Sequence, residues 1–560
     1  MMGNKSSQKL DFNPDLNLLE SLANFAEPPP DFNACLNAQG MYETMRFVLR
    51  LSPRNHDLVD SLSSGIHTVS EVSPEAFQAY STYLHETVHW WQHVGSTSGL
   101  VLSLCYLAQS HSSLRQLRAV LAEIGGKKSL KRWADDVLVQ GKDHNPDVLT
   151  AANIAVNNAL DVEFYKRYAM VPKKAEEVVN HSHFESVGHC YFIVYGQLLG
   201  MLSDTVDPEF AALPNAPKWE SIYADLRNRK HVGFYCGSPV YRPRVGLHAI
   251  FEGQARFIQL QFLDRPRRQS LTCEYMRSLG FLSGIYVEAF EEFLRLSESD
   301  WPSTIDDPLI SLFLLICDLA INPTRGFPLD IVNMERFIED VDVGVRFSLL
   351  SSAVRELPHL RQEILSCSRD EYEKVADELT AFCKYDHPFQ ALRAIADWAG
   401  MLPSLRELME EHRTFEFNET NQPIRVFFSH FVSFSQDRLK RPEFFCWPGA
   451  WFVGDRASWE IGEIWLRHLS LFSDRGDKPG VYAREWPTRS PVAVKDMFNR
   501  FYVGVVLYDL VRQWILQDGP FLYEFDWLTQ DFSQTQIEEW AKSIFERLFG
   551  MNPDNFEVFD

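Results

Sequence analysis

Three residues of one short segment have the types and the spacing of a hydrolytic metal site. His85 and His89 are four positions apart, and Glu86 directly follows the first histidine. Residues four apart on an α-helix project from the same face, so both imidazoles can reach one zinc ion at about 2.0–2.1 Å. Glu86 is offset by one residue, which brings its carboxylate to the open side of the metal. There it can accept a proton from zinc-bound water and deliver it to a leaving amine.

The surrounding residues predict the helix that this geometry requires. Ser73 offers a capping hydroxyl, and Pro74 suits the first helical position, where its missing N–H costs nothing. The helix is expected to run to His93 or Val94 and to stop at Gly95. Hydrophobic residues recur every three or four positions and form one packed stripe beside the two histidines. The members of this stripe are Phe77, Tyr80, Leu84, Val88 and Trp91.

The segment from His85 to His89 resembles the active-site helix of the zincin superfamily of metallopeptidases, and a looser resemblance extends from about Met45 to Asp264. Within this superfamily, the metzincin branch carries a glycine and a third histidine further along the chain. Gln92 and Gly95 occupy those positions here, so this branch does not match. The gluzincin branch takes its third ligand from a glutamate on a later helix.

Glu252 is the third ligand that the gluzincin resemblance implies. Such helices often read E-G-x-A, and Glu252 is followed by Gly253 and Ala255. These small residues are expected to let the helix pack closely on the active-site helix. A buried face is supplied by Leu247, Ile250, Phe251, Ile258 and Leu263. The resemblance therefore implies a zinc ion held by His85, His89 and Glu252, with water in the fourth position and the neighbouring glutamate as the base.

Other assignments of the third ligand stay open at this point. Glu163, on an expected helix, is the second choice, and Glu252 can alternatively be a surface residue paired with Arg256 four positions later. His93 continues the histidine face by one turn, too far along a straight helix to complete a tetrahedron, so a supporting or substrate contact is expected of it. A further cluster, which also fits a polar helix edge, consists of His181, His183, Glu185 and His189.

Two supporting roles are also expected around the metal. Some gluzincins carry an acid four residues after the glutamate ligand, where it orients a zinc histidine, but this chain has Arg256 there. A different residue must therefore make that contact. A peptidase also needs a donor for the tetrahedral oxyanion. The candidates, which the sequence does not rank, are Tyr235, Tyr241, Arg244, His248 and His231.

Helical spacing along most of the chain predicts a mainly α fold. The resemblance to zincins implies an α+β zincin-like catalytic core with a small N-terminal sheet, plus large helical additions. A chain of 560 residues is too long for one compact core. The expected units are an N-terminal tail (1–40), the metallopeptidase core (41–265), a helical domain (266–415) and a C-terminal helical domain (416–560). Strand-like composition at Met45–Leu51, and more weakly at Ile66–Ser70, supplies the sheet.

Charge and cysteine usage exclude several classes of protein. The formal net charge of −22 opposes binding to nucleic acid or to an anionic membrane. Nine scattered cysteines without a C-x-x-C pair form neither a disulfide framework nor a zinc ribbon. The N-terminus has no apolar signal segment, and the longest apolar run, Leu309 to Ile321, is too short to span a bilayer. A cytoplasmic protein is expected.

The sequence thus predicts a selective intracellular zinc endopeptidase that acts on a protein or peptide substrate, with a regulatory protein as a possible partner. Two alternatives stay open. One is a helical scaffold or interaction protein in which the motif has no function, and the other is a zinc hydrolase that cleaves a non-peptide amide. Phosphate-binding loops, dinucleotide fingerprints and nucleophile elbows are absent from the sequence.

Overall fold

The computed structural model describes residues 14, 39–62, 72–140, 145–453, 456–486, 488–529 and 531–559. The predicted strand Ile66–Ser70 and nearly all of the predicted tail lie outside these residues. Helices account for 67% of the chain and strands for 4%, which confirms a mainly α fold. None of the described helices combines the length and the apolar character that crossing a membrane requires.

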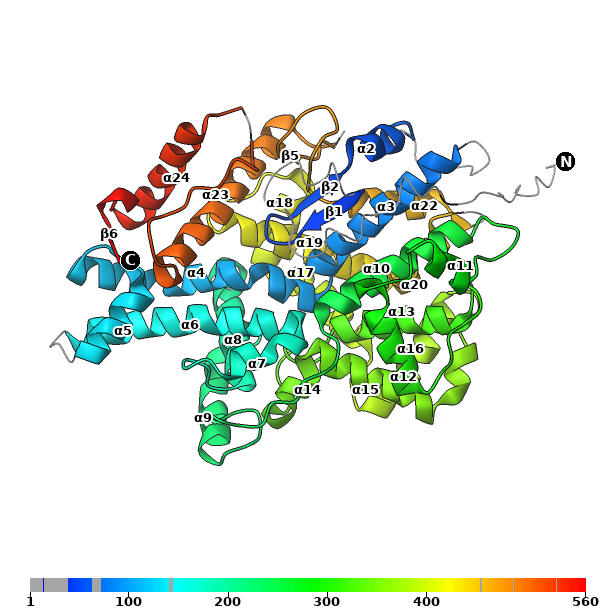
Figure 1. Cartoon of the computed structure of the whole chain (residues 1–560), viewed down its shortest axis with the longest axis horizontal. Helices are drawn as coiled ribbons and strands as arrows, with labels where there is room; N and C mark the ends of the chain where they lie inside the picture. The colour runs from blue at the N-terminus through cyan, green and yellow to red at the C-terminus, as the bar shows by residue number, and fades with distance from the viewer. Residues whose placement is uncertain are drawn as a thin grey trace.

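Four consecutive or neighbouring elements carry the candidate site: α3 (Pro74–Trp90), the π-helical turn η4 (Trp91–Gly95), α10 (Leu247–Asp264) and α12 (Ile285–Ser297). In Figure 1, α3 lies between the long helices α4 (Thr97–Ile124) and α6 at one end of the molecule and the green helices α10 to α16 at the other. Helix α10 packs directly on both α3 and α12.

The remaining elements surround this centre. The other α-helices are α2 (Pro53–Asp60), α5 (Leu130–Gln140), α6 (Pro146–Met170), α7 (Ala175–Val179), α8 (Val187–Val206), α9 (Glu220–Asn228), α11 (Cys273–Ser278), α13 (Pro308–Ile321), α14 (Phe337–Val341), α15 (Val343–Glu356), α16 (Arg369–Cys383), α17 (Pro388–Met401), α18 (Pro403–Thr414), α19 (Gln422–Lys440), α20 (Pro442–Cys446), α21 (Pro448–Trp451), α22 (Trp459–Arg467), α23 (Pro491–Leu516) and α24 (Gln534–Phe549). Short 3₁₀ turns are η5 (Pro172–Lys174), η6 (Ala216–Trp219), η7 (Met334–Arg336), η8 (Pro358–Gln362) and η10 (Pro553–Asn555).

A four-stranded sheet covers part of α3, and its strands come from both ends of the chain. Its order is β1 (Gly40–Glu43), β2 (Val48–Leu51), β4 (Phe472–Ser473) and β5 (Tyr482–Ala483). Strands β1 and β2 are antiparallel, β2 and β4 are parallel, and β4 and β5 are antiparallel. The sheet expected from N-terminal residues alone is therefore completed by residues from the C-terminal part.

The predicted strand Met45–Leu51 is shorter than expected. Met45 to Phe47 form the turn between β1 and β2, and Phe47 has a φ of 62°, which is incompatible with an extended strand. The strand therefore begins at Val48, where extended backbone resumes.

Packing crosses both of the predicted unit boundaries. The boundaries fall in loops, because α10 ends at Asp264 and α18 ends at Thr414. However, α19 packs against η4, α10 packs against α21, and one hydrophobic cluster extends from Tyr42 to Phe556. At the far end, β6 (Glu557–Val558) pairs in parallel with β3 (Lys127–Lys128), which ties the C-terminus to the α4–α5 connection (Figure 1). The division into units stays a prediction.

Candidate metal centre

The helix that carries the motif begins where the sequence predicts. The backbone N–H of Ala76 donates to the Ser73 hydroxyl at 3.1 Å, and Pro74 occupies the first helical turn. All five residues of the predicted stripe are buried. The α-helix changes into a π-helical turn at Trp91 and ends at Gly95, so the predicted end is confirmed. Such π-helical turns are frequent at functional sites.

The first turn of α4 fixes this π-helical turn in place. The Ser96 hydroxyl donates to the carbonyl oxygen of Gln92 at 2.6 Å. Gly99 lies so close that an ideal Cβ built on it would be 1.8 Å from the same oxygen, so a side chain at this position is excluded. The C-terminal end of the helix that carries both histidines is therefore held by two residues that follow it closely in sequence.

Helix α10 presents Glu252 to the two histidines. It begins at Leu247 after Gly246 and packs on α3 through stacked rings, because Phe77 and Phe262 have centroids 4.6 Å apart. Gly253 was expected to allow the close packing of α10 on α3, but it does not lie in this contact. An ideal Cβ on Gly253 would be 3.5 Å from Cβ of Ala289, so the glycine faces α12.

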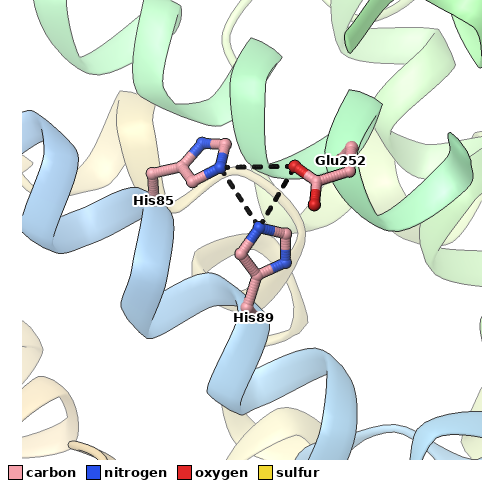
Figure 2. A group of neighbouring side chains, drawn as sticks. All are labelled: His85, His89 and Glu252. Atoms are coloured by element: carbon pink, nitrogen blue, oxygen red, sulfur yellow. Dashed lines mark hydrogen bonds and ion pairs between the residues drawn. The ribbon is translucent and has the colours of Figure 1, made fainter. Parts of the chain in front are cut away.

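The three predicted ligands lie together, as Figure 2 shows. Nε2 of His85 and Nε2 of His89 are 3.1 Å apart. Oε2 of Glu252 lies 3.6 Å from the His85 nitrogen and 3.4 Å from the His89 nitrogen. Both histidines come from α3 and the glutamate from α10. The alternative in which Glu252 is a surface residue is wrong, since its side chain is only 18% exposed and points at both imidazoles.

These distances fit one small tetrahedral cation. Ligand atoms bound to zinc at about 2.0–2.1 Å in tetrahedral geometry are about 3.3–3.4 Å from one another. The three observed separations of 3.1, 3.4 and 3.6 Å bracket this value. Within the described residues, no other group of three histidine, cysteine or acidic side chains has ligand atoms this close.

The charges of the three side chains also favour a cation. Burial lowers the pKa of His89, but the carboxylates of Glu252 and Glu86 and the bond to Gln92 outweigh burial and raise that pKa to about 9. Burial likewise raises the pKa of Glu252, but His89 and His85 hold it well below its ordinary value. Without a metal, a proton on His89 therefore balances the ionised glutamate, and a bound cation would take the place of that proton.

Gln92 orients His89 and joins the two ligand-bearing helices. Nδ1 of His89 lies 2.8 Å from Oε1 of Gln92, and the amide nitrogen of Gln92 donates at 2.9 Å both to the carbonyl of Phe251 and to the side-chain oxygen of Gln254. The amide oxygen can only accept, so Nδ1 of His89 carries the hydrogen and Nε2 is left as the metal-facing atom. Gln92, and not the residue at position 256, therefore makes the contact that orients a histidine.

Tyr286 and Arg256 line the other side of the site. The ring of Tyr286, from α12, lies edge-to-face with His85 at 5.9 Å between centroids. The Arg256 guanidinium lies 3.8 Å from the centroid of the Tyr286 ring and donates to Gln259. Arg256 therefore supports Tyr286, the aromatic neighbour of His85, by a cation–π contact.

Glu86 is buried beside the edge of the sheet. An ideal Cβ on Gly40, the first residue of β1, would lie 2.9 Å from both Cγ and Oε1 of Glu86. Because β1 is one of the two edge strands of the four-stranded sheet in the described structure, its glycine lets a sheet edge approach the predicted base closely. Any larger residue at this position would displace the Glu86 side chain.

The rival third ligands lie elsewhere. Glu163 accepts a hydrogen bond from Arg512 at 2.6 Å. His93 is buried between the rings of Tyr42 and Phe251 and is not part of the ligand group. Burial, with nearby positive charge, lowers its pKa to about 3. It is therefore a neutral packing residue.

The histidine-rich cluster lies at and before the start of α8 and forms polar contacts within itself, such as His189 with Glu185 at 3.7 Å, and with neighbouring residues. His183 lies 2.9 Å from Asn157, and His189 lies 3.1 Å from Asp161. Glu185 is 3.6 Å from Arg227. This arrangement is a polar helix edge, the second interpretation that the sequence allowed.

Of the five candidate oxyanion donors, His248 is the one that the described structure places against a ligand residue. Its Nε2 lies 3.9 Å from Oε1 of Glu252, and its side chain is 42% exposed. Tyr241 and Arg244 are exposed, and the ring of His231 packs on Phe234. His248 therefore stands at the solvent side of the ligand group.

Sequence reasoning missed the supporting roles of Gln92, Tyr286 and Gly40. Gln92 had a local signal, because a residue three positions after His89 returns to the same helix face. No local sequence signal indicated Tyr286 or Gly40, because Tyr286 lies on a separate helix and Gly40 on a strand.

The chain matches no protein-family model, no curated protein and no solved structure.

Proposed function

We propose that this chain is a zinc-dependent hydrolase with a gluzincin-like site that cleaves peptide bonds in a protein or peptide substrate. The observation that carries the proposal is the triangle of ligand atoms from His85, His89 and Glu252, whose edges match a tetrahedral zinc site. Two imidazoles and one carboxylate are a donor set of catalytic zinc sites, which leave the fourth position to water or substrate.

The residues around the ligands have different roles in the proposed hydrolysis. A bound zinc ion lowers the pKa of a water molecule to about 7 and polarises a carbonyl group. Glu86 accepts the proton of the attacking water and returns it to the leaving amine. His248, beside Glu252 and open to solvent, donates a hydrogen bond to the oxyanion that forms. Gln92 keeps His89 in the tautomer that binds the metal.

The edge strand favours a peptide as the substrate. An extended peptide can pair with an exposed strand edge through backbone hydrogen bonds. β1 is one of the two edge strands among the described residues, and its first residue, Gly40, lies against Glu86. A peptide paired with this strand would pass directly beside the base.

Metal content tests the proposal most directly. Purified wild type is expected to hold about one zinc ion per chain. His85→Ala and Glu252→Ala should lose it, while Glu86→Gln should keep it. Glu163→Ala is the matched control, because it removes a partly buried carboxylate that pairs with Arg512 instead. A wild-type protein that takes up no zinc after reconstitution would end the enzyme proposal and favour the scaffold alternative.

Cleavage is tested with a proteome-derived peptide library, in which new N-termini are counted by mass spectrometry. Wild type should generate them and Glu86→Gln should not. A zinc-loaded wild type that cleaves no peptide would instead favour the hydrolase of a non-peptide amide.

A further inference from the structure

A groove of about 1650 Å³ lies beside the sheet, away from the metal ligands. Its walls are formed by α2, by strands β2, β4 and β5, and by the C-terminal helices α23 and α24, which Figure 1 shows together along one edge of the molecule. Tyr83 of α3 lines it, and His85 follows two residues later. Two residues turn a helix by about 200°, so the groove and the ligands lie on opposite sides of α3.

The groove carries an excess of negative charge. Seven acidic side chains line it against three basic ones. Four of the acids are exposed and, within the described part of the chain, form no ion pair: Asp57, Asp60, Glu485 and Glu539. Of the basic residues, Arg484 donates to the carbonyl of Ser470 at 2.8 Å, Arg475 lies 4.0 Å from Asp477, and Lys495 is exposed. Exposed carboxylates therefore outnumber exposed basic side chains in the groove.

One buried carboxylate in the wall has an unsatisfied oxygen. Asp474 lines the groove and is only 2% exposed. Its Oδ1 accepts from the N–H of Leu51 at 3.1 Å and lies 2.7 Å from Nε2 of His56. Its Oδ2 is buried without a hydrogen-bond partner in the described structure. Because a buried carboxylate oxygen without a hydrogen-bond partner is costly, this oxygen indicates a place for a donor from outside the chain.

Much of the remaining lining is apolar. Val494, Phe498 and Trp540 contribute side chains from α23 and α24, and Phe532 at the groove is 58% exposed. Small-molecule sites typically measure about 300–1000 Å³. The volume of this groove exceeds that range, and its length along a sheet and two helices suits an extended polypeptide.

We propose that this groove binds an extended segment of a protein partner that carries apolar side chains and a net positive charge. Apolar side chains of the partner pack on Phe498 and Trp540. Basic side chains of the partner pair with Asp57, Asp60 and the unsatisfied oxygen of Asp474. The proposal goes beyond the hydrolase and does not depend on it, because none of these residues contacts the metal ligands in the described structure.

Peptide binding to the full chain tests the proposal. The probe is a short fluorescein-labelled peptide that alternates leucine with lysine and arginine. It is compared with one that carries glutamate at the basic positions and with one that carries serine at the leucine positions. Fluorescence anisotropy should show the basic, leucine-containing peptide binding at least tenfold more tightly than either relative. Equal binding of the three peptides would overturn the proposal.

Matched variants separate the groove from the general acidity of the chain. Asp57→Lys/Asp60→Lys should weaken binding of the basic peptide at least tenfold. Glu291→Lys/Glu463→Lys makes the same change in net charge at two exposed helical positions outside the groove and should leave affinity within twofold of wild type. Equal losses in both double variants would mean non-specific attraction and would overturn the proposal.

The metal site is excluded as the place of binding by a third comparison. Glu86→Gln and His85→Ala should bind the basic peptide as wild type does, whether or not zinc is present. Loss of binding in these variants would place the peptide at the metal site instead. Self-association of wild type that disappears in Asp57→Lys/Asp60→Lys would assign the groove to a second copy of the chain and would also overturn the proposal.

Discussion

Nδ1 of His89 lies 2.8 Å from the side-chain oxygen of Gln92, and the amide of Gln92 in turn donates to the backbone of α10 at Phe251. A single side chain thus sets the tautomer of one ligand and fixes the spacing between the helices that carry all three. Partners of this kind contribute to metal affinity as well as to ligand orientation.

Replacing Gln92 by alanine should lower zinc affinity about 10- to 100-fold, because His89 loses the acceptor that fixes its tautomer. Gln92→Glu keeps the acceptor for His89 but loses the amide donor to Phe251, so it should lower affinity less than alanine does. Competition with a chromogenic chelator measures both, and the visible spectrum of the cobalt-substituted protein reports ligand geometry. If alanine and glutamate reduce affinity equally, the residue contributes packing and not orientation.

Zinc affinity should rise with pH from about pH 7 and level off near pH 9. In the metal-free protein the pKa of His89 is raised to about 9, so below that pH a proton must leave before zinc binds. Raising the pH removes this competitor, and affinity should increase about tenfold per unit in this range. Calorimetry in buffers of different ionisation enthalpy should show about one proton released per zinc below pH 8. Constant affinity across this range would contradict the protonated histidine.

Gly40→Ala should lower turnover while zinc content stays unchanged. The added Cβ would lie 2.8 Å from Cγ2 of Thr82 and 2.9 Å from Cγ and Oε1 of Glu86, closer than real contacts allow, so the side chains around the carboxylate must shift. A displacement of about 1 Å at a reacting group can lower the rate about 100-fold. Turnover is followed with the peptide that wild type cleaves best in the library. Gly196→Ala is the control, because nothing lies within 4 Å of its added Cβ.

His248→Ala should reduce kcat by about 10²–10³ with little change in KM or in zinc content, as expected for a donor to the oxyanion. Its position 3.9 Å from Glu252, on the exposed side of the ligands, motivates this role. Tyr241→Phe, an exposed candidate from the same loop region, should leave kcat unchanged. If the loss appears in KM alone, His248 holds the substrate and does not act on the oxyanion.

Arg256→Met should lower thermal stability and weaken zinc binding modestly. The guanidinium lies over the ring of Tyr286, and this contact is worth about 2 kcal/mol when it is shielded from water. Methionine keeps much of the hydrophobic volume but removes the charge. Differential scanning fluorimetry, with and without zinc, measures both effects. Unchanged stability together with unchanged zinc affinity would show that Tyr286 is held by packing alone.

The sequence by itself determined the helix that carries His85 and His89. Ser73, Pro74 and Gly95 set its ends, and the spacing of His85 and His89 placed both imidazoles on one face. These are local properties, because caps act through neighbouring backbone groups and the helical period is fixed by its hydrogen bonds. The apolar run from Leu309 to Ile321, which forms most of the buried helix α13, is a local property of the same kind.

Tertiary structure decided which residues meet that helix. Glu252 reaches the histidines only because α10 packs on α3 through Phe77 and Phe262. Glu163 has the same carboxylate chemistry in the sequence, but in the folded chain it accepts a hydrogen bond from Arg512. Side-chain type states what a residue can do, whereas its partner depends on which helices pack together.

The same holds for the sheet and the groove. β2 pairs with β4, whose residues lie more than four hundred positions later in the chain, and the groove takes its walls from both ends of the sequence. Such contacts form because distant apolar faces must be buried against one another, and no local pattern encodes which faces those are. The sequence therefore determined which side-chain types are available along the chain, and long-range packing decided which of them lie together.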